Sequence, residues 1–277
     1  MPARTQHKEG RALVLILLIA LTAATLAAPV LLRTVGRAAF GIIALVPLGG
    51  FIWVARLFAT GVFANGGEIA AAFTWMPSTN LNLEFRLDAL AGLFSLIILG
   101  VGALVLFYCW GYFDSNPRRL AVFGAQLAMF AMVMYGLIIS DNFLLMYVFW
   151  ELTSLSSFLL IGFWKHLPEG RQGARMALTV TGMGGLAMIA GCLILGQIAG
   201  SYRLSDILLV REAIQASPYY LPALVLILIG AFTKSAQFPF HFWLPRAMAA
   251  PTPVSAYLHS ATMVKAGLFL MARLWPV

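Results

Sequence analysis

The sequence carries little charge and almost no cysteine. Of its 277 residues only 10% are Asp, Glu, Lys or Arg, whereas 61% are hydrophobic and the mean hydropathy is +0.91. So few polar residues cannot cover the surface of a water-soluble domain. The composition therefore indicates a protein embedded in the lipid bilayer. The two cysteines, Cys109 and Cys192, lie in apolar runs without metal-ligand or redox spacing, which argues against a disulfide framework or a zinc site.

The basic residues form no dense block, although the formal net charge is +8. Nucleic-acid-binding segments concentrate Lys and Arg, whereas here they are scattered among the connections between apolar runs, as in membrane proteins whose loops set the topology. Gly182, Gly184, Gly185 and Gly191 lack the strand-turn-helix context of a nucleotide motif and are typical of closely packed membrane helices. The sequence therefore predicts no nucleic-acid partner, no cofactor and no metal site.

Long apolar runs fill most of the chain. About 20 apolar residues are needed for a helix to cross a hydrocarbon core about 30 Å thick. We therefore predict an all-α integral membrane protein with about eight transmembrane helices. The predicted spans lie near residues 12–32, 38–59, 87–110, 120–139, 143–164, 176–199, 221–240 and 254–274. The first follows a basic stretch that resembles a signal peptide, but its length favours a retained helix.

Basic residues in two short loops favour one orientation in the membrane. Arg118 and Arg119 follow the third span, and the loop from Lys165 to Arg175 follows the fifth. When basic residues are counted over the whole chain, the two sides of the membrane have equal numbers. Basic residues close to helix ends, however, prefer the cytoplasm. We therefore predict that these two loops are cytoplasmic and that the N-terminus lies outside.

Two longer connections have patterns of their own. The connection 61–86 contains the turn signal Asn65-Gly66-Gly67, and apolar and polar residues then alternate over 81–88, which predicts a strand or hairpin on the outer face of the membrane domain. The connection 202–218 has the pattern of an interfacial amphipathic helix.

The seventh span is interrupted by proline. Pro239 follows Lys234 closely, and three further prolines, Pro245, Pro251 and Pro253, precede the eighth span. The backbone between about 235 and 253 cannot remain a continuous helix. Irregular backbone at membrane depth lines protein or a water-filled cavity, so the break predicts a hydrated passage; the alternative is that Pro239 only kinks a packing helix.

Two ionisable residues interrupt the apolar spans. Glu151 lies inside the fifth span, where an ionised carboxylate facing lipid costs at least about 2.5 kcal/mol. Lys234 lies deep in the seventh span and needs a partner, for which Glu151 is the natural candidate. Both side chains are expected to face the interior of the helix bundle.

The eighth span adds a polar face. At 3.6 residues per turn Ser255, His259 and Thr262 share one face, with Lys265 turned about 60° from Thr262. Histidine and a desolvated lysine can both change protonation state, so this face is a candidate proton path, although such residues can also be satisfied core groups. The other polar positions carry less weight: His241 is equally compatible with either role, and Asp141 reads as a helix cap or interfacial group.

Two segments of this sequence resemble the proton-translocating antiporter-like subunits, which include the large membrane subunits of respiratory complex I. The first is SDNFLLMYVFWELTSLSS at 140–157. The second comprises TKSAQFP at 233–239 and PTPVSAYLHSATMVKAG at 251–267. Within that family the phrases FHFWLP and MVKAG are most similar to the A subunit of the Mrp-type multisubunit Na+/H+ antiporter.

The resemblance implies a fold and a set of site residues. It implies a charge pair between Glu151 and Lys234, and proton transfer along a central hydrated axis by His259 and Lys265. Arg246 departs from the small or amide residue expected after WLP, so the lining there is expected to differ. Residues 1–119 would hold three helices and the outer hairpin, and 120–277 the first five-helix antiporter-like repeat, helices four to eight. The second repeat is absent, so we expect a fragment resembling the N-terminal part of such a subunit.

The resemblance also implies a function. We expect a proton-conducting subunit of a multisubunit cation/proton antiporter, a secondary ion transporter and not an enzyme, in a bacterial plasma membrane. Its expected partners are other membrane subunits, the lipid bilayer, H+ and Na+. The first alternative is a proton-pumping membrane subunit of a complex I-like NADH-quinone oxidoreductase or a related hydrogenase. The second is a structural membrane scaffold, which leaves the buried charges unexplained.

Overall fold

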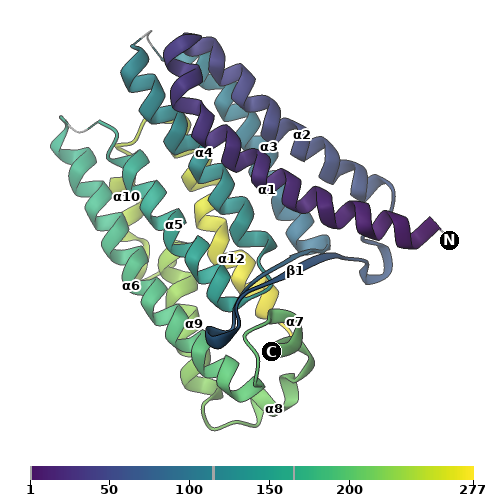
Figure 1. Cartoon of the computed structure of the whole chain (residues 1–277). Coiled ribbons are helices and arrows are strands. Elements are labelled where there is room, and N and C mark those ends of the chain that lie inside the picture. Colours follow the sequence, from purple (N-terminus) through teal and green to yellow (C-terminus); the bar gives the residue numbers. More distant parts are fainter. Residues whose placement is uncertain (1, 114–115, 165) are drawn as a thin grey trace.

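Helices dominate the computed structural model, which describes residues 2–113, 116–164 and 166–277 (Figure 1). Within these ranges six helices are long and apolar enough to cross a membrane. They are α1 (Pro2–Thr34), α2 (Ala39–Ala59), α3 (Ala89–Tyr112), α4 (Pro117–Ile139), α5 (Phe143–Ile161) and α6 (Pro168–Ala199). The all-α membrane architecture predicted from composition is thus confirmed.

The seventh predicted span is shorter than expected. Helix α9 (Tyr220–Lys234) has 15 residues, about 22 Å at 1.5 Å per residue, and ends within the depth of a bilayer core about 30 Å thick. The predicted continuation to residue 240 is wrong because Pro239 has no N–H and disfavours helix in the residue before it. The predicted break itself is confirmed: a 3₁₀ turn (Phe240–Phe242) and α10 (Trp243–Ala247) follow.

The eighth predicted span consists of three consecutive helical segments. Helix α11 (Thr252–Ser255) leads into a π-helix (Ala256–Thr262), which continues as α12 (Met263–Leu274). The count of eight spanning helices is therefore not confirmed, because α9 and α12 are both short of a full crossing by themselves.

A two-stranded hairpin connects α2 and α3, as the alternating pattern predicts. Strands β1 (Ile69–Met76) and β2 (Leu81–Leu87) are antiparallel, with Ile69 opposite Leu87. The turn signal before β1 is also confirmed, since Asn65 and Gly66 both adopt positive φ, which Asn and Gly tolerate best. The backbone N–H of Asp141 donates to the Glu84 carbonyl at 2.8 Å, so β2 is fixed to the connection between α4 and α5.

The connection after α6 forms two short helices, not one. Helix α7 (Leu204–Leu209) and helix α8 (Arg211–Gln215) lie below the hairpin in Figure 1. Leu204, Ile207 and Ile214 are buried whereas Arg211 and Glu212 are exposed, so the predicted amphipathic character is confirmed. The N–H of Leu204 donates to the Asp141 carbonyl, which attaches this segment to the same connection as the hairpin.

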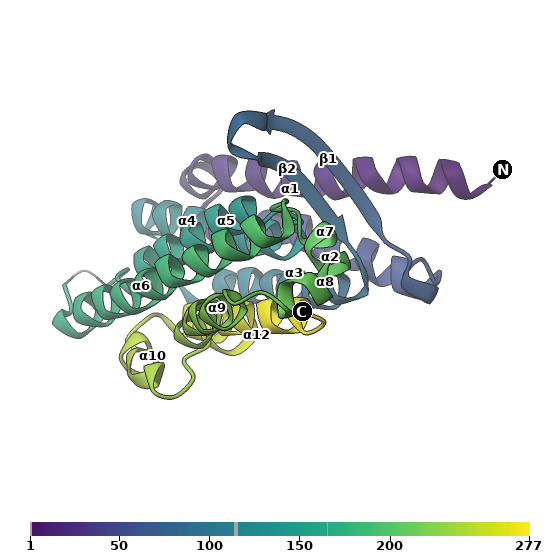
Figure 2. The same ribbon diagram turned by 90° about the horizontal axis from the view of Figure 1, so that it is seen from below.

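Helix α4 lies at the centre of the bundle. All residues from 133 to 139 are buried. Figure 2, seen from below, shows α1 and the hairpin on one side of α4, and α9, α10 and α12 on the other. The two ends of α4 thus mark two opposite faces of the protein: two arginines lie in its first turn, and the hairpin pairs with the chain just after its last residue.

Candidate functional site

Lys234 lies where three helices meet. It is the last residue of α9 and is fully buried. Its Nζ donates to the hydroxyl of Ser154 at 2.7 Å and to the carbonyl of Trp150 at 3.0 Å, both on α5, and lies 5.1 Å from the centre of the Trp150 ring. The ammonium is thus held by α5, as an intramembrane charge requires.

Glu151 belongs to the same junction but points to α6. Its half-buried side chain lies against Gly185, where an added Cβ would be 1.9 Å from the Glu151 Oε1 atom. Residue 151 is turned about 100° from residue 150 around the helix, which directs it away from the face that holds Lys234. Its Oε1 is buried and has no hydrogen-bond partner among the described residues.

The predicted direct pair of Glu151 and Lys234 is not formed. The two groups interact electrostatically, but within the described ranges no ion pair joins them. Ser154 and the Trp150 carbonyl take the hydrogen bonds instead, because they lie one turn apart on the α5 face that meets α9. The sequence analysis did not identify Ser154 as the acceptor for this lysine.

Glycines bring these helices together. A Cβ on Gly184 would lie 1.7 Å from the Thr233 hydroxyl, and one on Gly267 would lie 2.2 Å from the Ala231 carbonyl oxygen. The close packing predicted for Gly184, Gly185 and Gly191 is confirmed, whereas Gly182 has no neighbouring atom within 4 Å of its Cβ position. Small residues therefore set the helix separation at the junction.

Trp243 connects the broken end of α9 to His259. The Thr233 carbonyl, in the last turn of α9, accepts from the Ala236 N–H at 3.3 Å and has a second lone pair for another donor. The buried Trp243 indole donates to it at 2.9 Å. The same ring packs edge-to-face on His259, with the ring centres 6.0 Å apart.

His259 lies in the π-helix and is only 7% exposed. The Ala247 backbone interacts with it electrostatically, yet neither ring nitrogen has a hydrogen-bond partner of good geometry in the described chain. Thr262 donates to the carbonyl of Tyr257, five residues earlier, at 2.6 Å. The predicted shared face of Ser255, His259 and Thr262 assumed 3.6 residues per turn and does not hold through a π-helix, a form that is frequent at functional sites.

The remaining candidates lie apart from the junction. Lys265 is half-buried on α12 and has no hydrogen bond or ion pair in the part of the chain that the structure describes. His241 is exposed and stacks on Phe238 at 5.9 Å between ring centres. Arg246 is exposed, and only its backbone packs against Gly173. The structure therefore brings together Glu151 and Lys234, links His259 to them through Trp243, and leaves Lys265 outside.

A second charged cluster lies at the hairpin end. Buried Asp141 accepts from Ser205 at 2.5 Å and from Arg203 at 3.2 Å, and its carboxylate is 3.2 Å from Arg86 Nε. The cap of α5 is Asn142, not Asp141, because the Asn142 side chain accepts from the N–H groups of the first turn. Asp141 is thus the centre of an ion-pair network. The sequence did not predict this network, because it depends on the pairing of β2 with the connection between α4 and α5.

Asp88 is paired across the chain. It caps α3 and accepts hydrogen bonds from both terminal nitrogens of Arg273 on α12. Burial by itself raises the pKa of Asp88. The hydrogen bonds and charge of Arg273, the Ala91 N–H and the charge of Arg86 all lower this pKa, and together they outweigh burial. The net pKa is below the ordinary value for Asp.

Two protein-family descriptions match most of the chain. Residues 140–277 match "NADH:quinone oxidoreductase/Mrp antiporter, TM", and residues 75–123 match "NADH-Ubiquinone oxidoreductase (complex I), chain 5 N-terminus". The first match contains Glu151, Lys234, His259 and Lys265.

Curated relatives are subunits of antiporters. The chain is 53% identical over 235 residues to the A/B subunit of a probable K(+)/H(+) antiporter of Rhizobium meliloti, which covers 83% of this chain and 23% of the relative. It is 46% identical over 250 residues to the A1 subunit of a Na(+)/H(+) antiporter of Staphylococcus aureus strain JH9, which covers 90% of this chain and 31% of the relative. The chain therefore spans between about a quarter and a third of the length of these relatives.

Solved structures have the same arrangement of helices. The Mrp complex from Dietzia sp. DQ12-45-1b contains a chain that matches with a TM-score of 0.82 and 37% identity, over 93% of this chain and 27% of that one. A chain of an archaeal membrane-bound sulfane sulfur reductase matches with a TM-score of 0.78 over 95% of this chain and 53% of that one. At 22% identity the second match concerns the fold alone.

Proposed function

Because the chain belongs to the antiporter-like membrane subunits shared by Mrp antiporters and complex I, and is most similar to the N-terminal part of the Mrp A subunit, we propose that it conducts protons within a multisubunit cation/proton antiporter. Residues 120–277 then form the first five-helix repeat, after the three helices and hairpin of residues 1–119. The chain is part of a secondary ion transporter and is not an enzyme.

The observation that carries this proposal is a set of buried polar atoms around the broken end of α9 that have no hydrogen-bond partner of good geometry among the described residues. They are Glu151 Oε1, the Ser255 hydroxyl and both His259 ring nitrogens. Buried polar groups are nearly always hydrogen-bonded to protein or water. Their clustering at a broken intramembrane helix supports a hydrated proton path, since unpaired polar groups facing lipid would cost several kcal/mol each.

Lys234 acts as the switch in this mechanism. Approach of its ammonium to the Glu151 carboxylate stabilises the bound proton, and return to Ser154 and the Trp150 carbonyl weakens that stabilisation and promotes release. The observed position, hydrogen-bonded to Ser154 and not to Glu151, supports two alternative positions of one side chain. His259 receives the proton on the Trp243 side. We assign the next step to Lys265, six residues further along the same helical stretch, although its side chain lies apart from the junction.

The cation and the partners belong to the complete assembly. One relative is named as part of a K(+)/H(+) antiporter, the other as part of a Na(+)/H(+) antiporter. We assign Na+ as the exchanged cation, other membrane subunits as the partners, and the plasma membrane of a bacterium as the location. The sodium path itself lies outside the residues discussed above.

Transport by the complete complex in proteoliposomes tests the proposal. A pH gradient should dissipate on addition of Na+, and more strongly than on addition of K+ at equal concentration. Glu151→Gln and Lys234→Ala should each abolish this response. The double variant should assemble better than the worse single variant, because no unpaired buried charge remains. Near-normal antiport by either single variant, at a normal protein level, would refute the switch.

The second candidate function is a proton-pumping subunit of a redox-driven complex. Both family descriptions name NADH-quinone oxidoreductases, which supports this second candidate. Purification of the native complex separates the two candidates. Hydrophilic iron–sulfur subunits would accompany a pump, whereas an antiporter would retain membrane subunits and its loss would make cells salt-sensitive.

A further inference from the structure

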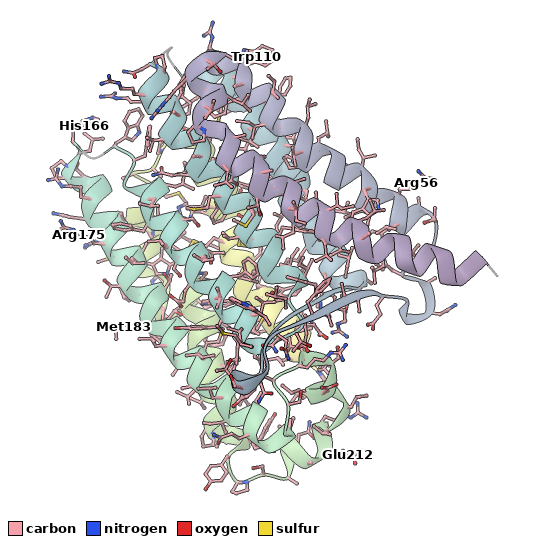
Figure 3. All side chains as sticks on the ribbon, viewed as in Figure 1. Arg56, Trp110, His166, Arg175, Met183 and Glu212 are labelled. Atoms are coloured by element: carbon pink, nitrogen blue, oxygen red, sulfur yellow. The ribbon has the colours of Figure 1, made fainter. Side chains whose placement is uncertain are left out.

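A basic pocket opens at the end of the bundle opposite the hairpin. It has a volume of about 680 Å³, within the range of about 300–1,000 Å³ that is usual for small-molecule sites. It lies between α4 and α6 and is closed underneath by the end of α5. Figure 3 shows His166 and Arg175 at this end and Glu212 at the opposite one.

Arginines from two helices surround the mouth of the pocket. Arg118 and Arg119 lie in the first turn of α4, and Arg171 and Arg175 lie one turn apart in the first two turns of α6. Arg118, Arg119 and Arg175 are exposed and form no ion pair within the described ranges. Among the described residues, no carboxylate lines the pocket. The guanidinium groups of Arg118, Arg119 and Arg175 at one mouth favour an anion with several acceptor oxygens, which Arg binds through paired hydrogen bonds.

The depth of the pocket is apolar. Val122 and Gln126 continue the Arg119 face of α4 inward, so that Gln126 lies about 10 Å below Arg119 at 1.5 Å per residue. Phe158 and Leu159 of α5 form an apolar wall. Gly162 and Ala174 bring the end of α5 close to α6, since a Cβ on Gly162 would already lie 3.4 Å from the Ala174 Cβ.

Polar and aromatic side chains also line the interior of the pocket. The Gln126 amide is half-buried, and its Oε1 is a buried acceptor without a partner in the described chain. Trp164 also lines the pocket and packs edge-to-face on His166, with the ring centres 5.8 Å apart. Trp is typical of the level between headgroups and acyl chains. The pocket is therefore cationic at its mouth, and its interior combines apolar side chains with the Gln126 amide and the Trp164 ring.

This combination matches the parts of one ligand class, and we propose that the pocket binds an anionic phospholipid. The phosphate lies among Arg118, Arg119 and Arg175, and the glycerol, ester and acyl parts lie in the interior along Trp164, Phe158, Leu159 and Gln126. Inorganic phosphate would use the mouth alone and leave the apolar depth without a function. Basic pockets between transmembrane helices are known to recognise anionic lipid headgroups.

Lipid retention by the purified complete complex tests the proposal. The complex is washed in mild detergent, and bound phospholipid is counted by native mass spectrometry. Dioctanoyl phosphatidylglycerol, dioctanoyl phosphatidylcholine and inorganic phosphate are then titrated in separate experiments. The test variant is Arg118→Gln/Arg175→Gln. Its matched control is Arg33→Gln/Arg37→Gln, which also removes two exposed arginines.

We expect the wild-type complex to bind phosphatidylglycerol in preference to phosphatidylcholine. At roughly a five- to six-fold loss for each Arg, the test variant should bind phosphatidylglycerol about thirty-fold more weakly, and the control should be unchanged. Equal losses in both variants would overturn the site in favour of general surface charge. If inorganic phosphate bound to the pocket as tightly as the lipid does, the pocket would be a general anion site and not a phospholipid site. Cross-linking of the pocket to a neighbouring subunit in a complex that retains no lipid would also overturn it.

Discussion

The ammonium of Lys234 is held by a hydroxyl and a carbonyl, although a carboxylate is close enough to interact with it. A hydroxyl can both accept from an ammonium and donate to a water. A salt bridge would hold the charge more tightly and would slow its movement. The arrangement therefore makes Ser154 the residue whose loss is most informative about how Lys234 moves.

Replacement of Ser154 by Ala tests this role. A hydrogen bond to a charged group contributes about 1.5–3 kcal/mol, so its loss should reduce antiport about tenfold or more. The matched control is Ser156→Ala, because the Ser156 hydroxyl is also buried in α5 but donates only within its own helix, to the Thr153 carbonyl. Initial rates of Na+-dependent pH change in proteoliposomes provide the measurement. Equal rates for the two variants would show that the Ser154 contact has no part in transport.

Asp88 provides a test outside the membrane-spanning segments. Because its folded-state pKa is below the ordinary value, its contribution to stability is complete above the unfolded pKa near 4 and is lost as the pH falls through the lower folded pKa. The melting temperature of Asp88→Asn should therefore lie below that of the wild type at neutral pH. This difference should narrow below about pH 4.

Thermal unfolding in detergent across this pH range measures the difference. The control is Glu212→Gln, which removes an exposed carboxylate at the same end of the protein and should leave the melting temperature unchanged. A gap between wild type and Asp88→Asn that stays constant down to pH 3 would show that the charge of Asp88 does not stabilise the fold.

At the scale of the element, helix α6 contains a matched pair of glycines. A methyl group at Gly184 would clash with Thr233 on α9, whereas one at Gly182 would meet nothing within 4 Å. Gly184→Ala should destabilise the protein by about 1–3 kcal/mol through overpacking and should also reduce antiport by separating α6 from α9. Gly182→Ala should be neutral or stabilising by up to about 1 kcal/mol, because Ala favours helix. Melting temperature and transport are measured on both; a milder effect at Gly184 would contradict the close approach.

The sequence predicted some elements well and others poorly for physical reasons. Hydropathy located α1 to α6, because a helix that crosses lipid needs a long apolar run, and alternation located β2. The end of α9 and the π-helix were missed, because periodicity assumes one helix type throughout. Glu151, Lys234 and His259 were identified because ionisable side chains are rare in transmembrane helices. The pairing of Lys234 with Ser154 depends on how α5 is rotated about its axis, and the close approach of Glu151 to Gly185 is part of that packing.

At the scale of the whole molecule, the two ends of α4 distinguish the two faces. The arginines that the structure gathers at one face are those that predict the cytoplasmic side, and the network of Arg86, Asp141 and Arg203 lies at the other. Lys165, which contributed to that prediction, lies outside the described residues. The grouping of the charges is therefore visible in the structure, whereas the orientation itself stays a prediction.

Cysteine labelling of intact cells tests the orientation. Native Cys109 and Cys192 are buried, which keeps the background low. Cysteines at Arg119 and Arg171 should react with an impermeant probe only after the cells are opened, and a cysteine at Thr79 in the hairpin should react from outside. Ready labelling of Arg119→Cys and Arg171→Cys in intact cells, with protection of Thr79→Cys, would invert the topology.

The contact between Asp88 and Arg273 also has a consequence for biosynthesis. The two residues are 185 positions apart in the chain. At about 5–20 residues per second, a ribosome needs about 9–37 seconds to add the arginine after the aspartate. During that interval helices α3 to α9 emerge, and Arg86, which lies 3.6 Å from Asp88 in the finished protein, is the cation available to the waiting carboxylate. The hairpin thus carries the provisional counter-ion, and the arrival of α12 completes the closure of the bundle.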